Sequence, residues 1–372
     1  MSRPRVLFVS RTRYRLPLGA AMERKWRALG EVLELRVLAS GRDPRARGDG
    51  VFHLVPPLPL RVLDGALFWL ALPFRVARLL RSFRPDAVIA QSPYETAATL
   101  LARAATRSQA RVVSDVQGDW RTATRLYGDG ARALLRPVAD RVASAALVRA
   151  DGVRTISPFT TRIVRELGLQ PLDTFPTYVD LDSFLEQEPV PPPAEPTALF
   201  VGVLEAYKNV DGLAAAWRVV AERLPEARLH VVGRGSLVEP VRALADAVPG
   251  VEWTRELDAR GVAAALDAAT LLVLPSRSEG MGRVVIEAFC RARLVVGSRT
   301  GGIADLVQDG VNGLLVDPGS TEALADALVR ALSDRPRAEA LGRKARETVQ
   351  PWLQTPEEFA RRTRAVVEAV LP

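Results

Sequence analysis

One stretch predicts the fold of the whole chain: LLVLPSRSEGMGRVVIEAF, Leu271 to Phe289. It opens with a short apolar run that ends at Pro275, which is typical of a buried strand. A loop with two glycines, Gly280 and Gly282, follows, and a helical pattern begins near Arg283. A strand, a glycine-containing loop and a helix in this order indicate one βα unit of a parallel sheet.

The same alternation recurs on both sides of this stretch. It predicts an α/β fold with two consecutive Rossmann-like, doubly wound parallel sheets. The strands expected in the first half are Arg5–Ser10, Leu33–Ala39, Val51–Val55, Ala87–Ala90, Arg111–Ser114, Gly152–Ile156 and Thr174–Pro176. Those expected in the second half are Ala198–Val203, Arg228–Val232, Gly250–Trp253, Leu271–Pro275, Leu294–Gly297 and Gly313–Val316.

A proline-rich segment divides the two halves. Residues Glu186 to Pro196 (EQEPVPPPAEP) contain five prolines, which disfavour both helix interiors and central strands. We read this segment as an interdomain linker. The expected domains are therefore residues 1–188 and 189–355, followed by a last helix within 356–372.

The amino-acid composition is that of a globular protein. Hydrophobic residues make up 48% and charged residues 25% of the 372, as in ordinary globular chains. One cysteine, Cys290, excludes a disulfide scaffold and fits a reducing compartment, so we expect a cytoplasmic protein. Two distant histidines do not suggest a metal centre, and we expect no metal. We also expect no signal peptide and no membrane-spanning segment.

The charge is unequally distributed. Residues 1–188 contain 29 Lys and Arg against 19 Asp and Glu, a net +10, whereas residues 189–372 have 22 against 24, a net −2. An arginine-rich coding habit would act on both halves alike. The contrast therefore points to an anionic partner for the first half: a nucleic acid, a membrane surface or a phosphorylated substrate.

One segment of the first half has two readings. Val62 to Phe74 (VLDGALFWLALPF) is almost wholly apolar, and Arg75, Arg78, Arg81 and Arg84 follow at helical spacing. It suits a core helix with an exposed arginine face. It also suits a helix lying on an anionic membrane, which would make the protein peripheral on the inner face of the cell membrane.

Two glutamates near one strand end suggest a diol-binding site. Glu279 precedes the helix that begins near Arg283, and Glu287 falls one turn inside it. A carboxylate offers two acceptors, which suits the two donors of a vicinal diol in a sugar or ribose. The glycines at 280 and 282 would let backbone amides approach such a ligand closely.

Three further loops follow predicted strands. Lys208 lies at the expected start of a helix, where the helix dipole disfavours a cation unless an anion such as a phosphate is also bound. Glycine turns open the next helices: Gly233-Arg234-Gly235 and Gly301-Gly302. Each places amides at the carboxyl end of a strand, where α/β proteins bind ligands.

Together these four segments resemble the carboxy-terminal domain of retaining glycosyltransferase family 4, which has the GT-B fold. Glu279 and Glu287 match its Glu-x7-Glu signature, and Lys208 matches the lysine of its V-G-x-L-x-x-x-K segment, which includes Gly202. Other matches are the glycines of residues 233–235 and 301–302, the run NGLLVDP over residues 312–318, and TYVDLDSF over residues 177–184.

The resemblance implies a metal-independent transferase whose second domain holds a nucleotide sugar (a UDP-, GDP- or ADP-sugar), with no other cofactor. The first domain would bind a glycan or lipid-linked acceptor across a central cleft, and the last helix would return to that domain. Glu287 would bind the ribose, Glu279 the donor sugar and Lys208 the leaving diphosphate. The backbone at Gly280, Met281 and Gly282 would approach the same sugar. We expect the three charged side chains to converge.

Three features depart from the family pattern. Val203 stands where an arginine is usual, so one diphosphate cation is absent, and Arg277, Arg283 or Arg299 would have to replace it. Gln117, in SDVQGDW with Asp119, stands where histidine is common and cannot titrate. The first loop, RTRYRLPLGAA, has only Gly19, and with Arg13 and its neighbouring arginines we expect it to contact the acceptor.

Two other functions fit parts of the sequence. The departures at 203 and 117 would suit a nucleotide-sugar binding protein with weak or lost turnover. Another GT-B enzyme, such as a sugar-nucleotide epimerase or a phosphorylase, would need a titratable base or a cofactor lysine that the sequence does not display. We expect no nucleic acid partner.

Overall fold

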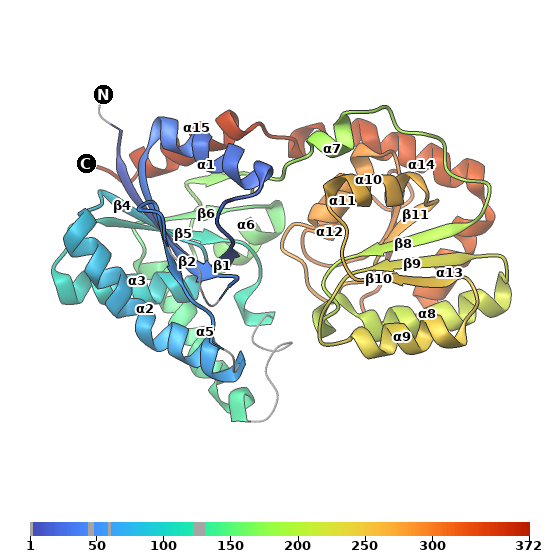
Figure 1. Cartoon of the computed structure of the whole chain (residues 1–372), viewed down its shortest axis with the longest axis horizontal. Helices are drawn as coiled ribbons and strands as arrows, with labels where there is room; N and C mark the ends of the chain where they lie inside the picture. The colour runs from blue at the N-terminus through green and yellow to red at the C-terminus, as the bar shows by residue number, and fades with distance from the viewer. Residues whose placement is uncertain (1–2, 44–47, 59–60, 123–130) are drawn as a thin grey trace. The chain divides into compact units, whose positions relative to one another are not determined.

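The computed structural model describes residues 3–43, 48–58, 61–122 and 131–372. The chain forms two compact units. The N-terminal unit comprises residues up to Tyr178 together with Gln354–Pro372, and the C-terminal unit comprises Val179–Leu353. Each unit has its own parallel sheet (Figure 1). The α/β fold class with two Rossmann-like sheets is therefore confirmed.

The sheet of the N-terminal unit has the order β3-β2-β1-β4-β5-β6-β7. Its strands are β1 (Arg5–Tyr14), β2 (Glu34–Gly41), β3 (Phe52–Val55), β4 (Ala87–Ala90), β5 (Arg111–Val116), β6 (Gly152–Thr155) and β7 (Asp173–Thr174). The helices are α1 (Ala20–Val32), α2 (Arg61–Phe83), α3 (Pro93–Thr106), α5 (Ala131–Arg149), α6 (Pro158–Arg165) and α15 (Pro356–Glu368).

Both faces of this sheet are covered, which explains the continuous apolar run of β1. Val6 and Phe8 lie in one core cluster with residues of α1 and α15. Leu7 lies in a second cluster with residues of α2. Alternate side chains of a strand point to opposite faces, so a strand between two helix layers must be apolar at every position.

β1 is longer than the sequence suggested. We expected it to end at Ser10, with a loop beyond, but pairing with β2 resumes at Arg13 and Tyr14 after an irregularity that follows Val9. The buried Tyr14 ring explains the extension, because it packs against Trp26 and Phe52 with ring centroids 6.1 and 5.3 Å away. The arginines at 11 and 13 are thus carried by a strand.

The sheet of the C-terminal unit has the order β10-β9-β8-β11-β12-β13. Its strands are β8 (Thr197–Val201), β9 (Arg228–Val232), β10 (Val251–Thr254), β11 (Leu271–Leu274), β12 (Leu294–Ser298) and β13 (Leu314–Val316). Its helices are α7 (Asp182–Leu185), α8 (Val210–Arg223), α9 (Val238–Ala247), α10 (Ala259–Asp267), α11 (Arg283–Cys290), α12 (Ile303–Leu306), α13 (Thr321–Ser333) and α14 (Arg335–Thr348). Two short 3₁₀ turns are η1 (Ala206–Lys208) and η2 (Gln350–Trp352).

Both sheets reverse their winding direction at one place. In the N-terminal sheet β1 lies beside β4, and in the C-terminal sheet β8 lies beside β11, while consecutive strands extend outward from each pair. Loops on the two sides of such a reversal diverge, which leaves a crevice at the carboxyl ends of the strands. Ligands are therefore expected to bind at the loops after β1 and β4 in one sheet, and at the loops after β8 and β11 in the other.

The division between the units falls upstream of the proline-rich segment. We expected it at residue 188, whereas the chain passes from one unit to the other at Tyr178–Val179. Two buried arginines, Arg291 and Arg293, explain the difference because they fasten the segment to the C-terminal unit. Their guanidinium groups donate hydrogen bonds to the carbonyl oxygens of Phe184, Gln187, Glu188 and Val190.

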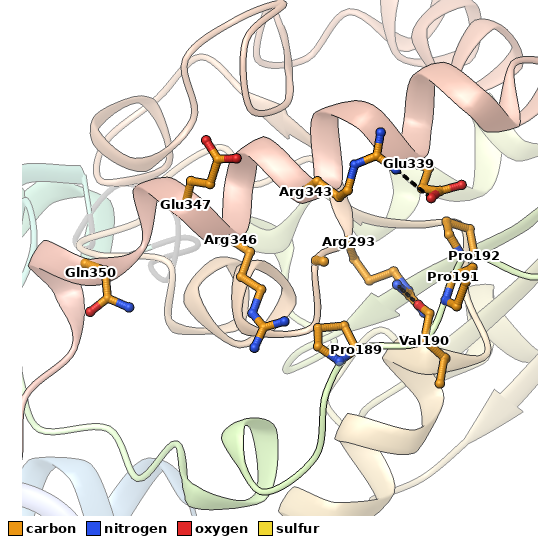
Figure 2. Close-up of a pocket in the computed structure, with 11 residues that line it drawn as sticks. Pro189, Val190, Pro191, Pro192, Arg293, Glu339, Arg343, Arg346, Glu347 and Gln350 are labelled. Carbon is orange, nitrogen blue, oxygen red and sulfur yellow. Dashed lines mark hydrogen bonds and ion pairs between the residues drawn. The ribbon is translucent and has the colours of Figure 1, made fainter.

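Figure 2 shows this attachment, with Arg293 reaching Val190 beside the prolines and the ion pair of Arg343 with Glu339 on α14. The residues drawn there line a groove. Arg291 and Arg293 precede β12, so the groove lies near the amino end of that strand, away from the crevice. The groove's exposed cations already have carboxylate partners, because Arg346 pairs with Glu188 as Arg343 does with Glu339.

The last helix, α15, belongs to the N-terminal unit, where it lies against α1 (Figure 1). Arg362 fastens it, donating to the Asp173 carboxylate with Nε at 3.0 Å and to the Thr174 carbonyl oxygen at 3.0 Å. Its guanidinium also lies 4.4 Å from the centre of the Phe175 ring. The chain thus returns to its first domain after completing the second.

Candidate active site

An ion pair joins the two loops at the reversal of the C-terminal sheet. Lys208 ends η1, which follows β8, and Glu279 lies in the loop between β11 and α11. The Lys208 Nζ contacts the Glu279 Oε2, and the two side chains are only 10% and 17% exposed. Lys208 thus has a counter-ion at the start of α8, the position where the sequence suggested that an anion was needed.

Arg277 fixes the relative position of these loops. Its backbone N–H donates to the Tyr207 carbonyl oxygen at 2.7 Å, and its guanidinium donates to the Ala206 carbonyl oxygen at 2.8 Å and pairs with Asp211 at 2.9 Å. We considered Arg277 as a replacement for the arginine that Val203 displaces. The structure instead gives it this structural contact, which its position in the sequence did not reveal.

The glycine pair at 301–302 allows the backbone of Glu279 to pack closely. The Gly302 N–H donates to the Glu279 carbonyl oxygen at 2.9 Å. A Cβ on Gly301 would lie 2.0 Å from that same oxygen, and one on Gly302 would lie 2.4 Å from the Gly280 carbonyl oxygen. Any side chain at either position would displace the loop that carries Glu279.

The other glycine turn packs in a similar way against the loop after β8. A Cβ on Gly233 would lie 1.9 Å from the Gly202 carbonyl oxygen, and one on Gly235 would lie 2.2 Å from the Leu204 carbonyl oxygen. The Leu204 N–H donates to the Arg234 carbonyl oxygen at 2.9 Å. These glycines therefore have a demonstrable packing role beside the donor-binding role expected from the sequence.

Glu287 is buried in α11 and is held differently from Glu279. Its nearest charged partner is Arg283, at 3.7 Å, and within the described part of the chain no hydrogen bond or ion pair links it to Lys208 or Glu279. Burial raises the pKa of Glu287, and the Arg283 guanidinium partly opposes that rise. Two of the three predicted charged groups are therefore in direct contact, and the third lies one turn inside the adjoining helix.

Three other predicted donor residues line the same loops. Gly282 precedes α11 with φ of 75°, a left-handed conformation that favours glycine. Met281 is buried, whereas Val203 is 44% exposed. An exposed apolar residue occupies the position where the family pattern has an arginine. Arg299, another suggested substitute, pairs with Asp309 at 2.8 Å.

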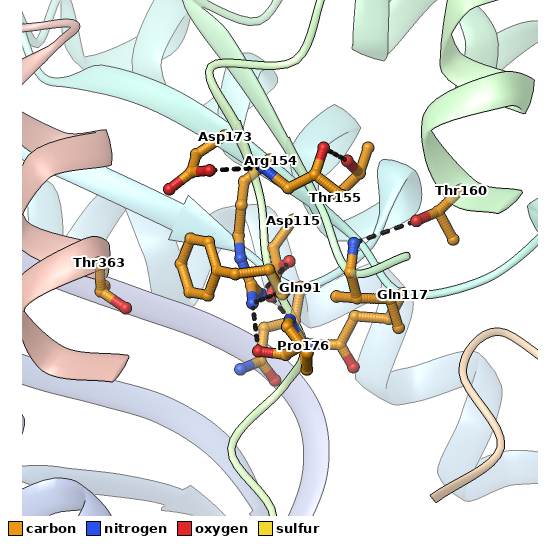
Figure 3. Close-up of polar contacts among 12 residues, drawn as sticks. Gln91, Asp115, Gln117, Arg154, Thr155, Thr160, Asp173, Pro176 and Thr363 are labelled. Atoms are coloured by element: carbon orange, nitrogen blue, oxygen red, sulfur yellow. Dashed lines mark hydrogen bonds and ion pairs between the residues drawn. The ribbon is translucent and has the colours of Figure 1, made fainter. Parts of the chain in front are cut away.

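In the N-terminal unit, Gln117 belongs to a buried polar network at the ends of β5 and β6 (Figure 3). Its Nε2 donates to the Asp115 Oδ2 at 2.9 Å, and Asp115 in turn pairs with Arg154 at 2.6 Å. Arg154 is buried and also donates to the Pro176 carbonyl oxygen. The Nε2 of Gln117 is thus engaged, and no hydrogen bond to its Oε1 is found among the described residues.

The remaining acceptor-side predictions lie near α1, α2 and β5. Arg13 pairs with Asp64 of α2 at 3.1 Å, and Gly19 precedes α1 with open space around its Cα. Asp119 accepts hydrogen bonds from Arg121 and from Thr122, so it organises its own loop. No hydrogen bond or ion pair joins Arg13, Gly19 and Asp119 to one another among the residues described.

Sequence reasoning missed Glu95, which is 4% exposed at the start of α3. Its Oε1 accepts the Arg11 N–H at 3.2 Å, and its Oε2 contacts the Ser92 Oγ. Burial raises its pKa to about 7, against opposing hydrogen bonds from its own backbone and that of Arg11. The Ser92-x-x-Glu95 spacing of a helix-capping box could have indicated it.

Two absences concern only the described part of the chain. No group of three or more His, Cys, Asp and Glu side chains is arranged to hold a metal ion there. No helix in this part combines the length and apolar character needed to cross a bilayer.

Two family models match consecutive parts of the chain. Residues 20–176 match the model for a glycosyl transferase 4-like domain, and residues 195–334 match the model for glycosyl transferases group 1. Together the two matches take in most of both sheets. Each half of the chain is therefore similar to a glycosyltransferase domain.

Two curated transferases are among the relatives of this chain. It is 30% identical over 244 residues to a GDP-mannose-dependent alpha-(1-6)-phosphatidylinositol monomannoside mannosyltransferase of Mycobacterium tuberculosis, covering 59% of this chain and 60% of that one. It is 33% identical over 163 residues to a sulfoquinovosyl transferase of Arabidopsis thaliana, covering 43% of this chain and 31% of that one. The chain thus spans between about a third and three fifths of these relatives.

Solved structures share the fold over the full length of this chain. Sucrose-phosphate synthase of Thermosynechococcus elongatus superimposes with a TM-score of 0.78 at 21% identity, covering 99% of both chains. HepE of Anabaena, in complex with UDP and glucose, gives 0.71 at 17% identity, covering 99% of this chain and 100% of that one. At these identities the likeness establishes the fold.

Proposed function

We propose that this chain transfers a sugar from a nucleotide-sugar donor to a glycan or lipid-linked acceptor, with retention of anomeric configuration and without a metal ion. The observation that carries the proposal is the contact of Lys208 with Glu279 at the reversal of the C-terminal sheet. It supports the proposal because a cation beside a carboxylate at the carboxyl end of the sheet suits a phosphate next to a sugar hydroxyl.

Charge development explains why the reaction needs these groups. As the bond from the anomeric carbon to the diphosphate breaks, negative charge accumulates on the leaving phosphate. The Lys208 ammonium, already desolvated among protein atoms, stabilises that charge more strongly than it would in water. Donor binding exchanges partners: the ammonium turns from Glu279 to the diphosphate, and the freed carboxylate accepts hydrogen bonds from sugar hydroxyls.

Retention follows if the acceptor attacks from the side of the departing group. The acceptor oxygen bonds to the anomeric carbon, the diphosphate leaves, and a leaving phosphate oxygen takes the acceptor's proton. Gln117 would then orient the acceptor through its Oε1, since its amide nitrogen is engaged by Asp115. We infer a cytoplasmic reaction on a glycan or on a lipid-linked sugar at the inner face of the cell membrane.

Paired variants test the site. Lys208→Ala and Glu279→Gln are assayed with a panel of UDP-, GDP- and ADP-sugars, beside Lys344→Ala and Glu347→Gln, whose residues form an exposed Lys–Glu pair in the same unit. We expect each variant of the buried pair to lower kcat about 10²–10³-fold, as loss of one transition-state charge contact does. The exposed pair should keep full activity.

Two results would contradict the assignment. The first is undiminished transfer by Glu279→Gln or Lys208→Ala. The second is equal loss in the exposed-pair variants with unchanged melting temperatures. Retention itself is read from the anomeric coupling constant of the product by proton NMR.

One observation favours a second candidate, a nucleotide-sugar binding protein with weak turnover. The 44% exposed Val203 leaves the diphosphate position with one cation fewer than the family pattern provides. Calorimetric donor binding without transfer or donor hydrolysis would support this candidate, and Val203→Arg should then increase turnover.

A further inference from the structure

Helix α2 has two apolar faces, of which the sheet uses one. Phe68, Leu72 and Val76 are at most 4% exposed and lie in the core cluster that contains Leu7 of β1. Their spacing of four residues places them on one side of the helix. This side anchors α2 to the sheet, so the helix remains in place whatever covers its other side.

The opposite side carries exposed apolar residues. Leu67 is 49%, Leu70 69% and Phe74 78% exposed. Spacings of three and four residues align them along two turns of the helix. A single exposed leucine is ordinary on a protein surface, but a row of three large apolar side chains on one helix indicates an interaction surface.

Arginine side chains extend the same row toward the end of the helix. Arg78 and Arg81 extend it at spacings of four and three residues, and Arg75 lies beside it. All three are exposed, and none forms an ion pair within the described part of the chain. The outward face of α2 is therefore apolar over its first exposed turns and positively charged over its last ones.

This arrangement suits an anionic bilayer better than a second copy of the chain. Antiparallel α2 helices would set the arginines of one copy against the leucines of the other, and parallel helices would set arginine against arginine. A bilayer with anionic headgroups offers both required environments at one interface, acyl chains for apolar tips and phosphates for guanidinium groups. The net +10 of residues 1–188 adds attraction toward such a surface.

We propose that Leu67, Leu70, Phe74, Arg78 and Arg81 form a docking surface for anionic lipid bilayers. Helix α2 lies along the membrane with its apolar tips inserted and its arginines on headgroup phosphates. Binding is reversible and weakens with salt, because three side chains insert only partly and the cations are solvated. The inference does not depend on the transferase activity, since lipid binding needs no donor.

Vesicle flotation of the full chain tests it. Vesicles of phosphatidylcholine containing phosphatidylglycerol are compared with phosphatidylcholine alone, at low and high salt. The variants are Leu70→Ser with Phe74→Ser, and Arg78→Glu with Arg81→Glu. The matched controls are Leu101→Ser, 62% exposed on α3, and Arg335→Glu with Arg337→Glu, exposed on α14 with the same charge change.

We expect the wild type and both controls to float with the anionic vesicles only, and less at high salt. Each arginine near the surface contributes about a fivefold change in partitioning, so the double charge reversal should abolish flotation. The serine pair should reduce it. The proposal is overturned if the wild type does not float, if the α2 variants float equally well, or if the controls lose binding to the same extent.

Light scattering after size-exclusion chromatography supplies an independent outcome. A wild-type dimer that Leu70→Ser with Phe74→Ser converts to a monomer would assign the face to self-association and overturn the lipid proposal. A monomer in both forms, together with salt-sensitive flotation of the wild type, supports it. Neither outcome alters the transfer assay on a water-soluble acceptor, so the two proposals fail separately.

Discussion

Single residues at the strand ends have more than one role. Gly301 and Gly302 are needed for packing against Glu279 and Gly280, and Glu95 holds the backbone of Arg11 near the end of β1. Such positions determine where loops lie before any ligand arrives. Substitutions at these positions therefore test packing and protonation separately from the transfer reaction.

Glu95→Gln should change how stability depends on pH. The folded chain holds the pKa of Glu95 at about 7, above its ordinary 4.5, so the folded state retains a proton that the unfolded state releases. Stability contributed by this group therefore falls as pH rises from about 4.5 to about 7, by up to about 3 kcal/mol. The glutamine variant lacks this fall and should gain stability over wild type at pH 8 but not at pH 4.5.

Urea unfolding at both pH values measures the difference, with the exposed Glu31→Gln as control. If wild type and Glu95→Gln lose stability in parallel between the two pH values, Glu95 does not hold a proton in the folded state.

Gly301→Ala should be more damaging than Gly310→Ala. Both glycines have positive φ, 51° and 73°, so both substitutions incur backbone strain. Only the first would drive a Cβ to 2.0 Å from the Glu279 carbonyl oxygen, whereas open space surrounds Gly310. We expect an additional loss of about 1–3 kcal/mol from overpacking, and lower transfer activity because the Glu279 loop must move. Thermal unfolding and the transfer assay check both; equal losses would argue against the packing contact.

Among the elements, α15 shows how a terminal helix is secured. It contributes Phe359 to the main core cluster of the N-terminal unit and reaches β7 through Arg362. The guanidinium donates to both oxygens of Asp173 and lies over Phe175. A planar, two-point contact of this kind is more specific than an exposed ion pair.

Arg362→Ala should destabilise the N-terminal unit by about 1–2 kcal/mol, since it removes a partly exposed bidentate pair and leaves Asp173 without its main cation. Arg364→Ala, which removes a helix-surface pair with Glu368, should cost less than about 0.5 kcal/mol. Thermal unfolding compares them, and limited proteolysis should release α15 only from the first variant. Equal stability of the two variants would contradict the anchoring role.

At the scale of the whole molecule, the sequence predicts the two sheets well. The spacing of apolar residues and the glycines and prolines between elements are local signals, which can be read without knowing the tertiary structure. Leu271–Leu274 and the helix from Arg283 lie where the pattern put them. The contact of Lys208 with Glu279 could be suspected but not established, since it depends on which strands become neighbours. Arg291 and Arg293 were not predicted to be buried, because an arginine-rich turn normally indicates surface.

The outward face of α2 was equally undecidable from the sequence. Both readings of Val62–Phe74 have merit: one side of the helix is core, and the other is exposed. A hydropathy pattern counts apolar residues but does not reveal that two separate sides carry them. Only the position of the neighbouring strands tells which leucines are covered.

The attachment of the proline run by Arg291 and Arg293 restricts where this chain can bend. The two guanidinium groups hold four carbonyl oxygens of residues 184–190. This segment is therefore fixed to the C-terminal unit and cannot serve as a hinge. Any turning of one lobe against the other must be absorbed by backbone rotation at the two crossings, Tyr178–Val179 and Leu353–Gln354. Substitutions that restrict those few bonds, and not changes to the prolines, would therefore limit such turning.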